Sequence, residues 1–225
     1  MANPPNLLND DGTASMATAF LSSHHGFRRD IRLFAGAVGR AVAGDASKLA
    51  ALSDEWKSYR NTLHGHHMME DTAVFPGLKQ QHPELAEIID GLSADHRKID
   101  PLLEEGDRAF ADLPAQLRPA VRVIGSLNSL LISHLETEET HIVPFLRDAK
   151  AFPPPASEAE LDLYAQGFAW SSYGIAPEVL EKLYELLTPE LRAKLPAARA
   201  AFEQRCKNVW GFAVAGATRT SIPDL

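Results

Sequence analysis

Residues 52–73 read LSDEWKSYRNTLHGHHMMEDTA, and this stretch decides the fold. Apolar residues recur along it in steps of alternately four and three, which places them on one face of a helix. Near the end of the stretch that face carries His66 and Glu70 in place of apolar residues. Because such a face packs into a protein core, the sequence predicts a buried histidine and glutamate one turn apart. The predicted face consists of Leu52, Trp56, Tyr59, Leu63, His66, Glu70 and Ala73.

Three further stretches show the same stepping, and a histidine interrupts each of them. The first carries His24, the third His96, and the fourth His134 followed by Glu138. His141 also falls on the fourth face, either as a further donor or as a polar capping group. The three faces are Phe20, His24, Phe27, Ile31, Phe34 and Val38; Leu85, Ile89, Leu92, His96, Ile99 and Leu103; and Ile124, Leu127, Leu131, His134, Glu138, His141 and Phe145.

The spacing of the interruptions predicts that they lie at one depth of a bundle. Antiparallel helices joined by short loops bring together residues that are equidistant from the loop. Helix breakers should therefore stand midway between the donors of consecutive helices. The midpoints are residue 45 beside Gly44, residue 82 next to Pro83, and residue 116 in the connection from Pro114 to Pro119. The sequence thus predicts an all-α protein built as an up-down-up-down four-helix bundle with a C-terminal helical extension.

Six polar groups in one layer of a core need partners. Burying a polar group without a hydrogen bond costs about 2 to 7 kcal/mol. Imidazole nitrogens and carboxylate oxygens are good ligands of first-row divalent metals, and six donors exceed the three or four protein ligands of a typical zinc site. The sequence therefore predicts two metal ions, with His24, His66, Glu70, His96, His134 and Glu138 as their ligands.

The order of these motifs resembles the hemerythrin-like HHE cation-binding domains. The resemblance rests on His24, residues 66–71 (HHMMED), His96 and residues 134–139 (HLETEE). Residues 24–30 (HHGFRRD) and 74–78 (VFPGL) are also similar to bacterial members, and the resemblance covers about residues 14–150. It implies a four-helix bundle that holds a di-iron centre, with manganese or zinc as alternative metals.

The chain departs from the animal hemerythrins at two positions. Asp100 stands where those proteins carry a second histidine four residues after the third-helix ligand. It is a weak ligand, an acceptor that orients His96, or a surface residue. The family's last carboxylate follows its histidine by five residues, which would select Glu139, whereas the apolar spacing favours Glu138. Glu139 is therefore the alternative to Glu138.

The remaining histidines and the arginines of the first helix receive less specific interpretations. His64 and His67 lie beside the second face and His82 precedes a proline, so they are interpreted as solvated groups or as partners of a metal ligand. Arg28, Arg29 and Arg32 are interpreted as a solvated helix face.

Composition and termini favour a soluble acidic protein of the cytoplasm. The formal net charge is −8 and 45% of the residues are hydrophobic, which disfavours nucleic-acid and anionic-membrane partners. No apolar run reaches the roughly 20 residues of a membrane span, and the first residues, MANPPN, lack the basic and then apolar pattern of a signal sequence. The lone Cys206 fits a reducing compartment.

The prolines at 153–155 are predicted to separate the bundle, residues 14–150, from a helical extension at residues 151–212. About 60 residues are few for an independent core, so the extension should pack on the bundle or on a partner subunit, as in a homodimer. The termini, residues 1–13 and 213–225, are expected to be flexible.

The predicted ligand set indicates the chemistry. Two ferrous ions bring four positive charges and Glu70 and Glu138 return two, so the site stays cationic and favours small anionic or diatomic ligands. The sequence therefore predicts a non-haem di-iron protein that binds or reacts with O2, peroxide or NO. Whether it is a catalase-like or oxygen-using oxidoreductase stays open. The alternatives are a reversible carrier or sensor of O2 or NO, and iron storage.

Overall fold

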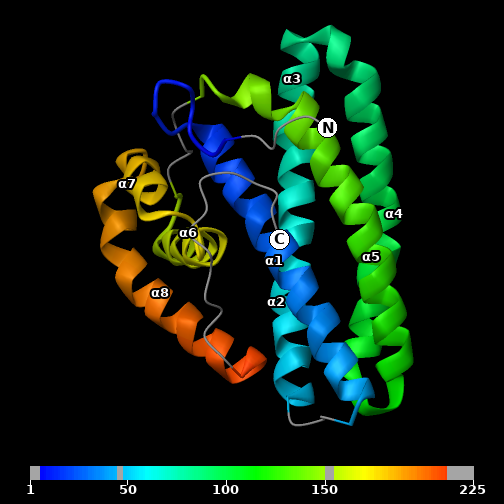
Figure 1. Cartoon of the computed structure of the whole chain (residues 1–225). Helices are drawn as coiled ribbons and strands as arrows, with labels where there is room; N and C mark the ends of the chain where they lie inside the picture. The colour runs from blue at the N-terminus through cyan, green and yellow to red at the C-terminus, as the bar shows by residue number, and fades with distance from the viewer. Residues whose placement is uncertain (1–5, 45–47, 150–154, 212–225) are drawn as a thin grey trace. The chain divides into compact units, whose positions relative to one another are not determined.

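The computed structural model describes residues 6–44, 48–149 and 155–211 (Figure 1). These residues form helices joined by short connections, which confirms the predicted all-α class. Their contacts divide the chain into two units, one of residues 1–27 and 142–225 and the other of residues 28–141. None of the described helices combines the length and the apolar character that a membrane span needs.

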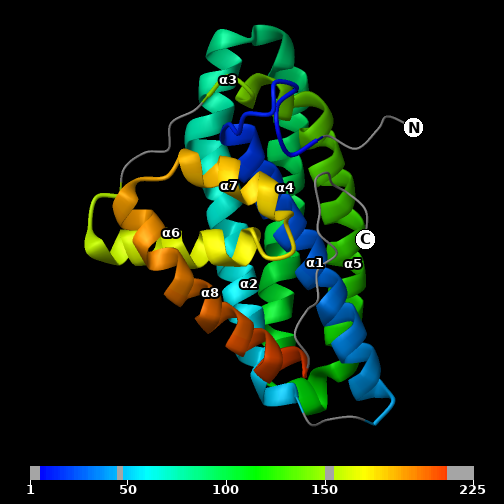
Figure 2. The same ribbon diagram turned by 60° about the vertical axis from the view of Figure 1, so that its left-hand side comes forward.

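The unit of residues 28–141 is built from long helices that lie side by side (Figures 1 and 2). It contains the second half of α1, and α2 continues through a π-helical turn, η1, into α3 without a break. The elements are α1 (Met16–Val42), α2 (Leu49–Met69), η1 (Glu70–Val74), α3 (Phe75–Gln81), the 3-10 turn η2 (Pro83–Leu85), α4 (Ala86–Ala111) and α5 (Leu113–His141).

The turns lie at or near the positions that the helix breakers predict. His82 leaves the helical conformation before Pro83, with φ −133° and ψ 74°. The turn between α4 and α5 comes at Asp112, ahead of the predicted Pro114 to Pro119 connection, and α5 is kinked at Gln116. Gly44, just after α1, has a φ of 106°, a conformation that glycine adopts without strain. The predicted midpoint at residue 45 lies outside the described residues.

The four predicted faces are buried except for three residues. Ala73, His141 and Phe145 are exposed, so the prediction was wrong for them. Ala73 lies in η1, where the wider turn moves the buried face along the chain, so that Phe75 and Leu78 are buried instead. His141 is the last residue of α5, and Phe145 lies beyond the end of that helix.

An aromatic cluster fills the core of this unit between α1, α2 and α4. The ring of Trp56 stacks on Phe110, with centroids 4.6 Å apart and planes 6° apart, and Phe34 meets both rings edge-on. The indole N–H of Trp56 donates to an oxygen of Asp107 over 2.9 Å. Gly106 leaves room for this indole, because a Cβ atom there would lie 1.9 Å from Trp56 Cζ2.

Replacing Gly106 by Ala should therefore destabilise the protein. The extra methyl group has to displace Trp56 or the backbone of α4, and such overpacking costs about 1 to 3 kcal/mol. Urea unfolding followed by tryptophan fluorescence measures the effect. Gly91→Ala is the matched control on the same helix, because nothing lies within 4 Å of its Cβ position. This control should gain about 0.5 to 1 kcal/mol, and equal stabilities of the two variants would contradict the argument.

The other unit combines the first half of α1 with the C-terminal helices. Its elements are the 3-10 turn η3 (Val143–Leu146), α6 (Glu158–Ser171), α7 (Pro177–Glu185) and α8 (Pro189–Trp210). Ser157 and Thr188 cap α6 and α8 by accepting hydrogen bonds from the backbone N–H of Glu160 and Leu191. The ring of Trp170 lies against Gly26 and at 4.9 Å from the ring of Phe27, so residues of the predicted extension contact α1 within this unit.

Of the N-terminal segment that was predicted to be flexible, the structure describes residues 6–13. Residues 6–13 were expected to be loose, but Leu7 is fully buried and its carbonyl accepts a hydrogen bond from Thr18. Leu7 therefore packs into its unit, and the expected flexibility of the termini stays a prediction. Residues 1–5, the prolines at 153 and 154, and the predicted flexible end at 213–225 lie outside the described residues. The boundary at residue 150 and a homodimer through the extension stay predictions.

Candidate metal centre

Polar donors from three helical segments meet in the core of the unit of residues 28–141. The continuous helix α2 to α3 provides His66, His67 and Glu70, α4 provides His96, and α5 provides His134 and Glu138. Each of these six side chains belongs to a residue that is at most 9% exposed. A concentration of buried imidazoles and carboxylates needs compensation, because desolvation without partners costs several kcal/mol.

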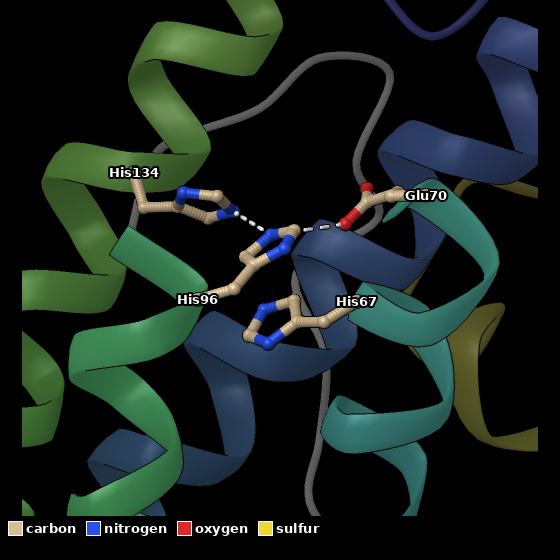
Figure 3. Close-up of side chains that lie close together, drawn as sticks. All are labelled: His67, Glu70, His96 and His134. Atoms are coloured by element: carbon tan, nitrogen blue, oxygen red, sulfur yellow. Dashed lines mark hydrogen bonds and ion pairs between the residues drawn. The ribbon is translucent and has the colours of Figure 1, made fainter. Parts of the chain in front are cut away.

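Four of the six donors form one compact group (Figure 3). A ligand atom from each of His67, Glu70, His96 and His134 lies within 4.8 Å of all the others. The Nε2 atom of His96 is 3.2 Å from Nε2 of His134 and 3.4 Å from Oε2 of Glu70. These atoms converge on a volume that one metal ion can fill.

A second group shares Glu70 with the first. One ligand atom from each of His66, Glu70 and Glu138 lies within the same 4.8 Å limit. Oε1 of Glu70 is 3.0 Å from Nε2 of His66, while its Oε2 faces His96. Glu138 in turn lies 3.4 Å from Nε2 of His134 through its Oε1. The two oxygens of Glu70 therefore face different histidines.

His67 is the donor that the sequence interpretation missed. It is buried rather than solvated, and within the described part of the chain neither of its ring nitrogens has a hydrogen-bond partner. Its ring stacks on His96, with centroids 4.1 Å apart and planes 14° apart. Burial, followed by the nearby His96, lowers the pKa of His67 far below that of a solvated imidazole. A neutral buried imidazole with an available lone pair is suited to a metal.

The alternatives that the sequence left open now have definite positions. Asp100 is about half exposed and lies 3.5 Å from Nδ1 of His64, on the outside of the bundle. His141 is exposed, so it is neither a buried donor nor part of the two groups. Glu139 is buried and paired with an arginine, whereas Glu138 lies in the second donor group.

That arginine is Arg28, and it corrects the interpretation of α1. Arg28 and Arg29 are buried, and only Arg32 is exposed as expected. Both terminal nitrogens of Arg28 donate to Glu139, with Nη2 3.1 Å from Oε2, in a bidentate ion pair between α1 and α5. Glu139 is thereby neutralised by a cation of the protein itself.

His24, the remaining predicted ligand, belongs to the other unit. It is fully buried on α1, and its ring centroid lies 4.5 Å from that of Phe20. Its role as a metal ligand stays a prediction from the sequence.

Charged neighbours hold His96 between two carboxylates. Glu70 faces its Nε2, and Asp71 accepts a hydrogen bond from its Nδ1 over 2.9 Å. Burial opposes protonation, but the bonds to Glu70 and Asp71 outweigh it and raise the pKa of His96 in the metal-free protein. A cation in this position is favoured by the surroundings, whether it is a proton or a metal.

One known family matches the part of the chain that contains these donors. The family model described as "Hemerythrin HHE cation binding domain" matches residues 15–158, which is more than half of the chain. The match includes every donor described above. The searches of curated proteins and of solved structures gave no significant match.

Proposed function

The chain belongs to the hemerythrin HHE cation-binding domain family, and on that premise we propose that it is a non-haem di-iron protein that binds or reacts with O2, peroxide or NO. The site is the buried His/Glu cluster, in an up-down-up-down bundle whose long helices are α1, α2 with α3, α4 and α5. The proposed ligands are His24, His66, His67, Glu70, His96, His134 and Glu138.

The observation that carries the proposal is the position of Glu70 between two donor groups. Its Oε1 lies 3.0 Å from His66 and its Oε2 3.4 Å from His96, so one carboxylate serves both groups. A single ion could be held by the donors of only one group, although Glu70 belongs to both. Two ions, with Glu70 as a ligand available to both, would use the donors of both groups.

The charge of the protein donors favours the binding of small anionic or redox-active molecules and disfavours strongly oxidising chemistry. Glu70 and Glu138 are the carboxylates of the two groups, because Arg28 neutralises Glu139. When bound, a pair of irons would supply one-electron redox steps and net positive charge for an anionic or diatomic ligand. The protein then has to exclude bulk water from the donors and keep its histidines neutral.

Apolar side chains next to the donors meet that requirement. Leu63, Ile99 and Leu131 each lie one helical turn from a donor histidine, and all three are fully buried. Such a lining keeps bulk water and protons away from the donors and admits small neutral molecules.

Anaerobic iron loading tests the proposal. The purified protein is stripped of metal, loaded with ferrous iron without O2, freed of excess iron, and assayed for iron per chain and for its optical spectrum. We expect about two ions per chain and new visible absorption after exposure to O2, H2O2 or NO. A stoichiometry below about one ion per chain, with manganese and zinc also excluded, would end the proposal.

The same sample separates an enzyme from a carrier. Repeated release of O2 from added H2O2, or consumption of O2 with an electron donor, indicates an oxidoreductase. A visible band that forms with O2 or NO and disappears on evacuation, without turnover, indicates reversible binding. Iron retained beyond about two ions per chain would indicate storage instead.

His67→Leu should have opposite effects on the metal-free and the loaded protein. In the metal-free protein it removes two buried nitrogens that have no hydrogen-bond partner within the described residues, so stability should rise by about 1 kcal/mol. In the loaded protein it removes a donor, so metal affinity should fall. Calorimetric melting of both forms measures the two signs. His64→Leu is the control, because His64 is partly exposed and outside both groups. Equal shifts of both forms would show that His67 is not a ligand.

A further inference from the structure

Asp71 joins two helices through contacts to Ser93 and His96. Its Oδ1 accepts a hydrogen bond from the hydroxyl of Ser93 over 2.6 Å, and its Oδ2 lies 2.9 Å from Nδ1 of His96. Ser93 and His96 are one turn apart on α4, whereas Asp71 lies in η1. Unlike Glu70, Asp71 is partly exposed and belongs to neither donor group.

The π-helical turn places Asp71 where it can reach this histidine. In an α-helix, consecutive side chains point about 100° apart, so neighbouring residues rarely contact the same ring. The turn Glu70–Val74 is wider than an α-helical turn, and such π-bulges occur frequently at functional sites. Here Glu70 faces Nε2 of His96 while the next residue, Asp71, contacts Nδ1. Two consecutive carboxylates therefore bracket one imidazole.

Stacking fixes the plane of the His96 ring but not which way round the ring lies. The rings of His67 and Phe75 are within 14° and 11° of parallel to it, with centroids 4.1 and 5.8 Å away. A half-turn of the imidazole about its bond to Cβ keeps the same plane, and exchanges nitrogens for carbons. Stacking is nearly indifferent to that exchange. A carboxylate on one edge is not, because it needs an N–H donor there.

We propose that Asp71 is a positioning residue for His96, an inference that rests on the proposed metal site. Asp71 accepts the proton of Nδ1 and thereby fixes both the orientation and the tautomer of the ring. The lone pair of Nε2 then points toward Glu70 and His134. The hydroxyl of Ser93 holds the other carboxylate oxygen and limits the rotation of Asp71. Outer partners of this kind orient metal-ligating histidines and increase their basicity.

Metal affinity is the first measurement. Zinc serves as a diamagnetic probe, and competition with a chromophoric chelator gives its affinity for each variant. Asp71→Ala should weaken binding at the group that contains His96 by about 10-fold to 100-fold, and Ser93→Ala should weaken it by less. Asp71→Asn retains the size of the side chain and should lie between them. Asp100→Asn is the control, because it removes a carboxylate of α4 that faces His64 instead.

The tautomer of His96 is the second measurement, and it separates positioning from general stability. Nitrogen-15 NMR of zinc-loaded protein with labelled histidine should show His96 protonated at Nδ1 and bound through Nε2. In Asp71→Ala the ring should lose that single state. Wild-type affinity together with an unchanged His96 tautomer in Asp71→Ala would overturn the inference.

Measurements on the metal-free protein distinguish a failure of this inference from a failure of the proposed function. Nδ1 of His96 should carry a hydrogen-bonded proton that exchanges slowly with water even before metal is added, and Asp71→Ala should abolish its resonance. If the wild-type protein binds no metal but shows this proton, the di-iron proposal fails while the Asp71–His96 contact stands. If metal binds and the proton resonance is absent, the positioning inference fails alone.

Discussion

Replacing Glu70 by Gln is expected to abolish the binding of both proposed metal ions while leaving the metal-free protein folded. Glu70 is fully buried and is the one residue common to the two donor groups among the described residues. Gln has nearly the same shape and can still donate to or accept from the neighbouring imidazoles, so the core should stay filled. It cannot supply two anionic oxygens to two ions. Because the loss of an outer partner alone costs about 10-fold to 100-fold in metal affinity, loss of this shared ligand should exceed 100-fold.

Iron per chain after anaerobic loading and desalting measures this effect, and melting with and without metal adds a second reading. A ligand that binds only the folded state raises its stability in proportion to the logarithm of its concentration over the dissociation constant. The wild-type protein should therefore melt at higher temperature with metal, and Glu70→Gln should show no such increase. Glu136→Gln is the control on α5, where the carboxylate is exposed. Retention of one ion by Glu70→Gln would mean that Glu70 does not bridge.

Much of the fold and part of the site follow from helical spacing alone. A buried face repeats every three or four residues, so His66, Glu70, His96, His134 and Glu138 could be assigned to the core without coordinates. Their predicted common depth rests on turns near residues 82 and 116, and the structure turns at His82 and at Asp112, four residues before the second of these. Local periodicity and chain length between turns are properties of the sequence itself.

The π-helical turn could not be predicted in this way. Spacing rules assume 3.6 residues per turn, and a single wide turn breaks the count for everything after it. This is why Ala73 is exposed and Phe75 buried. The sequence has histidines at both 66 and 67. Because the spacing argument places one buried residue in each turn, it assigned only His66 to the core.

The sequence also could not predict which charged residues far apart in the chain form a buried ion pair. Arg28 and Glu139 are 111 residues apart, and each stands among charged residues that are typical of an exposed helix face. Nothing in the local pattern distinguishes Arg28, which is buried, from Arg32, which is exposed. Only the approach of α1 to α5 brings Arg28 to the carboxylate of Glu139.

Replacing Arg28 by Met should destabilise the protein by about 3 to 5 kcal/mol. Arg28 and Glu139 are 1% and 4% exposed as side chains, and their bidentate pair satisfies both groups inside the core. Removal of the arginine leaves the Glu139 carboxylate buried without its cation. Chemical unfolding at neutral pH measures the loss. Lys57→Met is the control, because the side chains of Lys57 and Asp54 are 66% and 83% exposed and such pairs contribute at most about 1 kcal/mol.

The double variant Arg28→Met with Glu139→Leu distinguishes the ion pair from a ligand role of Glu139. With both charges removed, apolar side chains fill similar space, and stability should return to near the wild-type value, since buried ion pairs often contribute little over such replacements. Metal stoichiometry should also match the wild type, because Glu138 and not Glu139 lies in a donor group. Recovery of stability with loss of metal would identify Glu139 as a ligand. Failure to recover stability would mean that the pair holds α1 on α5 more strongly than packing can replace.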